Sequence, residues 1–96
     1  MIKNFASKTA EDIFNGVFSK NSKKIDTLLH AKIGRLFDQL DAATKVDTLR
    51  VPPSNHLEKL SGNMKDFWSI RVNKQWRVIF KWNKNDAIDV DVVDYH

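Results

Sequence analysis

Two arginines and a carboxyl-terminal tripeptide carry the side chains in this sequence that could cleave RNA. Arg71 and Arg77 lie in the last third of the chain, which closes on Asp94, Tyr95 and His96. Attack of an RNA 2′-hydroxyl on its own phosphate needs a proton acceptor, a proton donor to the leaving 5′-oxygen and positive charge beside the phosphate. Histidine, tyrosine and arginine can fill these roles without a metal ion. The alternative is that the last two residues form a frayed tail without a role.

Predicted strands determine where the arginines lie. Antiparallel strands with one buried face alternate apolar and polar side chains, as residues 67–72, 76–82 and 87–93 do. A three-residue hairpin loop, Asn73-Lys74-Gln75, produces three apolar cross-strand pairs: Val72 with Trp76, Ile70 with Val78, and Trp68 with Phe80. The same register places Arg71 directly opposite Arg77. Because like charges in such a pair repel each other, an anion between or beside them would explain the arrangement.

The next predicted hairpin brings an aspartate to the arginines. An odd-length loop within residues 83–86 matches the apolar side chains of the two strands: Phe80 with Ile88, Val78 with Val90, and Trp76 with Val92. Arg77 then meets Asp91 on the face away from the core, which leaves Arg71 as the freer ligand for a phosphate. The alternative is a solvated row of these three charged side chains, which would contribute little to stability.

The first half of the chain predicts two helices. Ser7 or Thr9 can cap a helix that runs to about Val17, with Glu11 and Asp12 in its first turn. Its predicted apolar face consists of Ile13, Phe14, Val17 and Phe18. A second helix is predicted to begin at Asn21 or Ser22, because its apolar residues repeat every 3.6 positions: Ile25, Leu28, Leu29, Ile33, Leu36, Phe37, Leu40 and Ala43.

Shorter predicted elements complete the expected fold. Residues 1–5 could form an edge strand, Pro52-Pro53 predicts an extended path, and a short strand is expected at 57–60. His30 lies off the apolar stripe and is expected in solvent. Helices followed by strands are typical of an α+β fold. We expect a single domain over residues 1–96, with two N-terminal helices packed on one face of an antiparallel β-sheet.

Charge and composition limit the class of protein. Residues 1–85 hold 16 basic and 8 acidic side chains, a net of +8, which favours a polyanion such as nucleic acid; a lysine-rich solubilising surface is the alternative. There is no cysteine, which excludes disulfides and thiolate chemistry, and the three histidines lack metal-ligand spacing. No apolar run approaches the roughly 20 residues that span a bilayer. We expect a cytoplasmic protein that needs no metal, cofactor or membrane.

Four segments of the sequence resemble a known toxin family. They are Leu57–Asn63 (LEKLSGN), Trp68–Asn73 (WSIRVN), Gln75–Val78 (QWRV) and Val93–His96 (VDYH). In this order they resemble the HigB-like "plasmid maintenance system killer" branch of the RelE/ParE toxin superfamily. Two earlier segments, Leu40–Thr44 and Arg50–Pro53, are similar to the GraT-like subgroup of that branch. The resemblance covers nearly the whole chain.

The resemblance implies a RelE-like α+β fold and a type II toxin. The implied activity is metal-independent, ribosome-dependent endoribonuclease cleavage of messenger RNA, and the implied partner is a HigA-like helix-turn-helix antitoxin, through which alone the toxin would reach operator DNA. Carried over by position, Arg71 and Arg77 would bind the scissile phosphate. Asp94, Tyr95 and His96 would complete the catalytic centre, with His96 as general acid or base. Implied RNA-binding residues are Glu58, Lys59, Ser61, Asn73 and Lys74.

Two positions depart from several family members. Glu58 stands where others have histidine and Ser61 where others have lysine, so fewer proton-transfer groups and fewer cations face the RNA, and a weak toxin is expected. Two alternative functions stay open. A ParE-like toxin would poison DNA gyrase, although such toxins generally lack the Tyr-His ending, and a non-catalytic module would bind ribosomal RNA.

Overall fold

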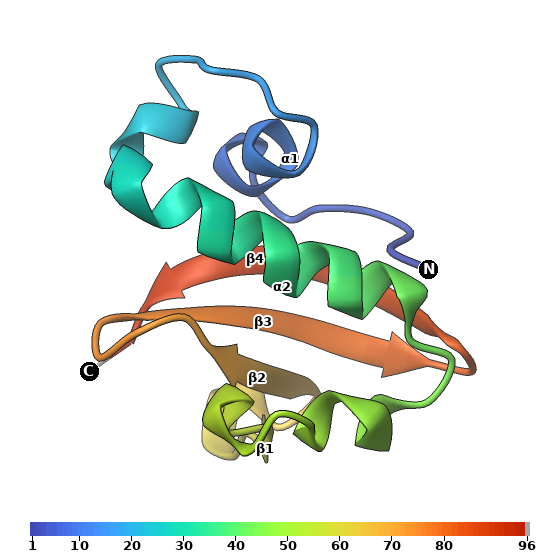
Figure 1. Cartoon of the computed structure of the whole chain (residues 1–96). Coiled ribbons are helices and arrows are strands. Elements are labelled where there is room, and N and C mark those ends of the chain that lie inside the picture. The colour runs from blue at the N-terminus through green and yellow to red at the C-terminus, as the bar shows by residue number, and fades with distance from the viewer. Residues whose placement is uncertain (96) are drawn as a thin grey trace.

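A four-stranded antiparallel sheet forms one layer of the molecule, and two helices form the other (Figure 1). The computed structural model describes residues 1–95. The strands lie side by side in chain order: β1 (Glu58–Lys59), β2 (Phe67–Arg71), β3 (Trp76–Asn83) and β4 (Asp86–Asp94). Helices α1 (Lys8–Phe14) and α2 (His30–Ala42) lie over the same face of the sheet. The predicted α+β arrangement of two N-terminal helices on an antiparallel sheet is therefore confirmed.

The core lies between α2 and the apolar face of the sheet. Most of the predicted stripe of α2 is buried: Ile33, Leu36, Phe37 and Leu40. Five of the alternating sheet residues predicted to face inward are fully buried: Ile70, Val72, Val78, Phe80 and Val90. The predicted inward tryptophans are partly buried against this core: Trp68, Trp76 and Trp82. Phe37 also contacts the rings of Phe5 and Phe14 edge-on, with ring centroids 5.6 and 6.1 Å apart. Arg71 and Arg77 lie on the other face of the sheet.

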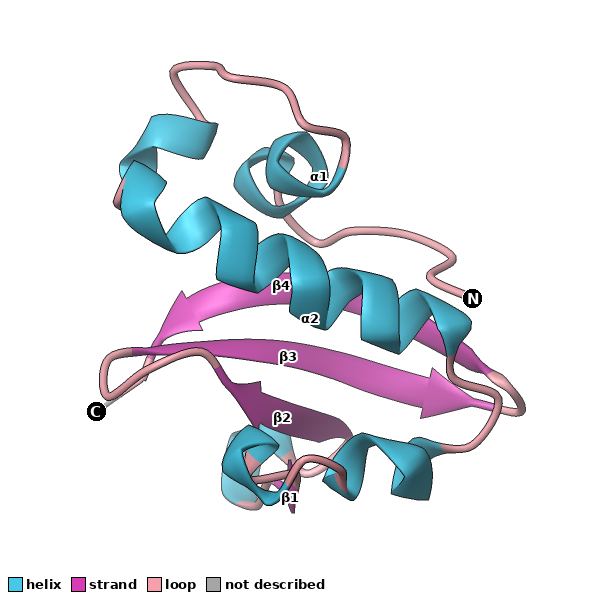
Figure 2. Cartoon of the chain, in the orientation of Figure 1, coloured by secondary structure: helices cyan, strands magenta, loops and turns pink. Residues whose placement is uncertain are grey.

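Both helices are shorter than predicted (Figure 2). Ser7 caps α1 as expected, but Gly16 reverses the chain with a φ of +70°, so Val17 and Phe18 are exposed rather than part of an apolar face. Residues 22–29 form two 3-10 turns, and the Asp26 carboxylate accepts a hydrogen bond from the amide of Leu28. That turn directs Leu28 outward, 85% exposed.

The N-terminal segment forms isolated bridges to the sheet, and the segment before β1 forms single 3-10 turns. Ile2 and Phe5 form parallel bridges to Ala87 and Val90 of β4, in place of the edge strand predicted for residues 1–5. His30 is half-buried rather than in solvent, with Nε2 3.0 Å from the carbonyl of Ile25. Residues 46–50 and 53–55 form 3-10 turns, and the predicted short strand is present as β1. In the part of the chain that the structure describes, no helix is long and apolar enough to cross a membrane.

The register between β2 and β3 is the predicted one. Trp68 pairs with Phe80, Ile70 with Val78, and Arg71 lies opposite Arg77. The predicted register between β3 and β4 is wrong. Val78 pairs with Val92, Arg77 with Val93 and Ile79 with Asp91. A bulge between Ile79 and Lys81 then shifts the pairing, so a two-residue turn connects Asn83 to Asp86 and Ala87 is buried in place of Ile88.

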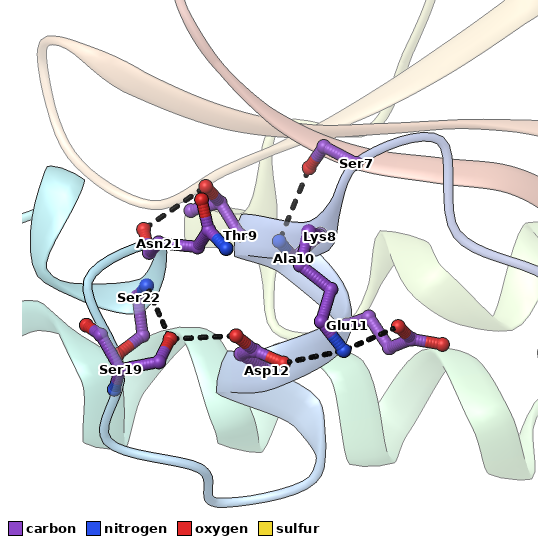
Figure 3. Close-up of polar contacts among 9 residues, drawn as sticks. All are labelled: Ser7, Lys8, Thr9, Ala10, Glu11, Asp12, Ser19, Asn21 and Ser22. Carbon is purple, nitrogen blue, oxygen red and sulfur yellow. Dashed lines mark hydrogen bonds and ion pairs between the residues drawn. The ribbon is translucent and has the colours of Figure 1, made fainter.

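A polar network fixes the chain as it leaves α1 (Figure 3). Asp12 is only 3% exposed; its carboxylate accepts a hydrogen bond of 2.6 Å from the Ser19 hydroxyl and lies 3.1 Å from the Lys8 ammonium. The Ser19 hydroxyl in turn accepts from the amide of Ser22. The hydrogen bond from Ser19, with the charge of Lys8, holds the pKa of Asp12 below its ordinary value of 3.8 despite the opposing effect of burial.

Replacing Asp12 by asparagine is expected to destabilise the protein at neutral pH. It should also make the free energy of unfolding less dependent on pH in acid. A carboxylate whose pKa is lowered by folding stabilises the native state above its unfolded pKa and loses that contribution as pH falls through the folded value. The difference in unfolding free energy between wild type and Asp12→Asn should therefore shrink below about pH 3.9. Denaturant titrations from pH 7 to 2 measure it. Asp38→Asn, an exposed change on α2, is the control, and a constant difference across the range would contradict the assignment.

Candidate active site

Strands β2 and β3 place Arg71 and Arg77 on the sheet face opposite the helices. Ile70 and Val78 point into the core, so their neighbours in each strand point the other way. Ser69, Arg71, Arg77 and Ile79 therefore share one face. Glu58 joins this face because it pairs with Ser69 across β1 and β2. The arrangement places two arginines and one glutamate on the sheet face opposite α1 and α2, where Ser69, Arg77 and Ile79 are nevertheless buried.

Arg77 is held by groups from three segments. Its Nη2 donates a hydrogen bond of 2.7 Å to the carbonyl of His56, and its Nη1 lies 3.8 Å from a carboxylate oxygen of Glu58. The guanidinium carbon lies 5.3 Å from the centre of the Tyr95 ring, a distance that suits a cation–π contact. Arg77 is consequently only 8% exposed, which corrects the expectation of a solvent-facing side chain. Its Nε is buried and has no hydrogen-bond partner within residues 1–95.

Asp91 does not neutralise Arg77, contrary to the prediction. The actual register sets Asp91 opposite Ile79 and Val93 opposite Arg77. The Asp91 carboxylate instead accepts a hydrogen bond of 2.6 Å from Ser7, the residue that caps α1. Its role in the described structure is to join the N-terminal segment to β4. Glu58 is the carboxylate beside Arg77.

Arg71 diverges from Arg77 although the two residues are paired. Its Nε donates to the carbonyl of Asn73, at 3.3 Å, and the side chain is half-buried. Arg71 forms no ion pair with any residue in the range 1–95. The side-chain oxygen of Asn73 accepts hydrogen bonds from the amides of Gln75 and Trp76. These hydrogen bonds fix the hairpin loop. The Arg71 side chain lies along the loop, whereas the Arg77 side chain contacts Tyr95.

The C-terminal residues lie beside the β2–β3 hairpin. The Tyr95 amide donates to the carbonyl of Gln75 at 2.6 Å, and the Gln75 side chain donates to the Asp94 carboxylate at 3.0 Å. Tyr95 is 44% exposed, so one side of its ring contacts Arg77 and its remaining surface is accessible. His96, the predicted general acid or base, lies outside the described residues.

The predicted RNA-binding residues divide between two places. Glu58 and Asn73 lie beside Arg77 and Arg71 respectively, and Lys74 is exposed at the hairpin tip. Lys59 pairs with Trp68 and its ammonium lies 5.2 Å from the centre of that ring, so it points away from the arginines. Ser61 is exposed at the start of the turn Gly62–Met64 and has no contact with this group.

Sequence reasoning missed the role of His56. This residue adopts a left-handed conformation, with a φ of 46°, at the end of the turn Pro53–Asn55. The buried Asn55 fixes the turn, because its side-chain nitrogen donates to the carbonyl of Leu49 at 3.0 Å and to Gln39 at 3.1 Å. His56 then presents its carbonyl to Arg77. The contact depends on the backbone, so no residue pattern could have indicated it.

Comparison with known proteins identifies the family. The family model described as "RelE-like toxin of type II toxin-antitoxin system HigB" matches residues 3–96. The chain belongs to this family. Toxin HigB-1 of Vibrio cholerae serotype O1 is 39% identical over 89 residues, with 93% of this chain and 92% of that protein covered. Endoribonuclease HigB of Proteus vulgaris is 30% identical over 101 residues, and both chains are covered completely.

Solved structures agree on the fold of this HigB-like toxin. The YoeB dimer from Staphylococcus aureus superposes with a TM-score of 0.59 at 20% identity, covering 99% of this chain and 97% of that one. YafQ from Escherichia coli gives a TM-score of 0.56 at 14% identity, covering 98% and 93%. These likenesses confirm the predicted RelE-like fold. They do not distinguish a subgroup, so the GraT-like placement stays a prediction.

Proposed function

We propose that this HigB-like toxin is a ribosome-dependent endoribonuclease that cuts messenger RNA during translation and so inhibits growth. The observation that carries the proposal is the fixed guanidinium of Arg77, packed against Tyr95 and paired in register with Arg71. The name of the Proteus vulgaris relative, Endoribonuclease HigB, supports the same activity. The reaction needs no redox step, and the roles below call for no metal or cofactor.

Arg77 supplies positive charge where it is most effective. A preorganised donor in a site with little water stabilises developing negative charge without reorganising during the reaction. The contacts with the His56 carbonyl and Glu58 hold the guanidinium in place. Within the described residues the buried Nε has no hydrogen-bond partner, and we assign this donor to an oxygen of the scissile phosphate. Arg71, which has no ion-pair partner in the described chain, adds positive charge next to the scissile phosphate.

The C-terminal tripeptide supplies the proton transfers. Tyr95 contacts Arg77 directly, so its hydroxyl lies on the same side of the sheet as the bound phosphate. His96 follows Tyr95 in the sequence, and we assign it as general acid or base because imidazole titrates near neutrality. Asp94 is assigned to orient this segment through the Gln75 side chain. Glu58, Lys59, Ser61, Asn73 and Lys74 are assigned to contact the flanking RNA, with Lys59 and Ser61 at its periphery.

The partners follow from membership of a type II toxin–antitoxin family. An antitoxin is implied by that membership, and we assign it to the HigA-like helix-turn-helix class. The ribosome with its message would be the target, and operator DNA would be contacted only through the toxin–antitoxin complex. We assign the protein to the cytoplasm, where these proposed partners are found.

We expect purified toxin to cut a message that is being translated and to leave the same RNA intact without ribosomes. The site residues described above contact the message at few points, so we expect the ribosome to position it for cleavage. Primer extension on a reading frame, with and without its start codon, maps the cuts. Cuts confined to the translated frame support the proposal. Efficient cutting of naked RNA would overturn ribosome dependence, and gyrase-dependent DNA breaks without RNA cuts would favour the ParE-like alternative.

A further inference from the structure

A cavity beside the β2–β3 hairpin gathers cations from distant parts of the chain. It encloses about 320 Å³ and is lined by Lys32, Ser54, His56, Arg71, Asn73 and Lys74; we call it the hairpin cavity. Lys32 comes from the beginning of α2, which lies above the hairpin at the left of Figure 1. The volume falls at the lower end of the range for small-ligand sites. A nucleotide-sized group would fill it.

Among the described residues, no carboxylate compensates the charges of the hairpin cavity. Lys32, Arg71 and Lys74 form no ion pair within residues 1–95, and none of the described residues that line the cavity is acidic. Three cations around one concave surface raise the local potential and attract anions. Arg77, in contrast, is compensated by Glu58 and packed on Tyr95. The two paired arginines therefore have different electrostatic surroundings.

His56 connects the hairpin cavity to the site of Arg77. Its carbonyl accepts the hydrogen bond from Arg77, and the same residue lines the cavity. A left-handed conformation is unfavourable for residues other than glycine and clusters at functional sites. The turn that holds His56 in this conformation therefore borders both the cavity and the guanidinium of Arg77. A chain of linked phosphates could occupy both places at once.

We propose that the hairpin cavity binds a backbone phosphate of single-stranded RNA adjacent to the phosphate that is cut. Lys32, Arg71 and Lys74 contact this second phosphate, and Lys32 is the contact that nothing in the sequence pattern indicated. The inference rests on the proposed function for its substrate class. The two can be tested separately, because RNA binding at the cavity does not depend on cleavage.

The test measures binding to a 2′-O-methylated single-stranded RNA oligonucleotide, which cannot be cut because its 2′-oxygen is blocked. Affinity is followed by fluorescence anisotropy between 50 and 200 mM salt. Each phosphate contact with a single strand contributes a slope of about −0.7 in log affinity against log salt. If the contact contributes nothing at 1 M salt, Lys32→Ala should weaken binding about eight-fold at 50 mM and about three-fold at 200 mM. Lys32 is exposed, so the variant should fold.

The matched control is a second pair of variants, Lys32→Glu and Lys45→Glu. Both change the net charge equally, but Lys45 is exposed beyond the far end of α2, about 15 Å or more along the helix. Weakened binding by Lys32→Glu alone supports the proposal. Equal effects of both variants, unchanged binding, or no binding by wild type at 50 mM salt would overturn it. A Lys32→Glu protein that no longer binds antitoxin but still binds RNA as wild type does would also overturn the proposal. Absence of cleavage by wild type would overturn the proposed function only.

Discussion

Replacing Arg77 by alanine is expected to slow cleavage of translated message by about 10²–10³-fold. Loss of one preorganised donor to a transition-state charge commonly has an effect of this size. Arg77 qualifies because the His56 carbonyl and Glu58 hold its guanidinium before substrate arrives. Arg77→Lys keeps the charge but not the planar donor geometry, so it should restore only part of the rate. Single-turnover cleavage on programmed ribosomes measures both variants.

Stability must be measured alongside the rate, because Arg77 is buried and its loss leaves the His56 carbonyl without this donor. Melting temperature and antitoxin binding report whether each variant is folded. Lys81→Ala is the matched control. Lys81 lies opposite Phe67 in the sheet and on the same face as Arg77, but its ammonium forms an ion pair with Asp89. We expect Lys81→Ala to cut within a few-fold of wild type. Full-rate cutting by folded Arg77→Ala would show that Arg77 is only structural.

Replacing His96 by alanine is expected to lower the cleavage rate by about 10²–10⁴-fold, the usual contribution of a positioned acid or base. The assignment rests on the sequence Asp94-Tyr95-His96 and on the contact between Tyr95 and Arg77. Because imidazole titrates near neutrality, the variant should also lose one limb of the pH–rate profile. The protein should melt as wild type does, bind antitoxin and fail to arrest growth.

Two companion variants sharpen the His96 test. His30→Ala removes a histidine from the helical layer, where its ring contacts the carbonyl of Ile25, and should leave the pH–rate profile unchanged. Tyr95→Phe keeps the ring under Arg77 and removes only the hydroxyl, so any rate loss reports proton transfer rather than packing. If His96→Ala retains both toxicity and the wild-type pH profile, the proton acceptor is another group.

The sheet shows how far sequence parity can be trusted. The β2–β3 register was predictable because three apolar pairs agree with one loop length, and a slip of one residue would turn every core side chain outward. The same argument failed for β3 and β4, since a bulge between Ile79 and Lys81 absorbs one residue. A bulge changes which side chains meet and shifts the alternation by one residue along β4, where Ala87, Val90 and Val92 are the buried residues. Asp91 was therefore assigned to Arg77, and Val93 is there instead.

The prediction of the helical layer was wrong in two places, each for a local reason. The periodic pattern from Ile25 to Ala43 predicted the buried face of α2, but Asp26 provides a cap that begins a separate 3-10 turn. Apolar periodicity gives no weight to such a cap, so Leu28 was placed in the core. Similarly, Gly16 ends the N-terminal helix before Val17 and Phe18 can join its apolar face.

The candidate site was predictable in its residue types and not in its contacts. Strand parity placed Arg71 opposite Arg77 on the open face, and the structure agrees. The burial of Arg77 depends on His56 and Tyr95, which lie 21 and 18 positions away in the sequence. Such contacts arise from the path of the turn before β1 and from the residue that follows β4. Lys32 is more distant still, and only the folded chain brings it to the hairpin.

The amino-terminal segment also limits how this sheet can grow. Strand edges with unpaired amides and carbonyls are templates for pairing with other chains, and long exposed edges favour aggregation. Here Lys3 and Ala6 donate to carbonyls of β4, while Met1 and Asn4 accept from its amides. The opposite edge is β1, a strand of only two residues. Intermolecular strand addition along residues 87–90 would first require the chain to release its own first six residues.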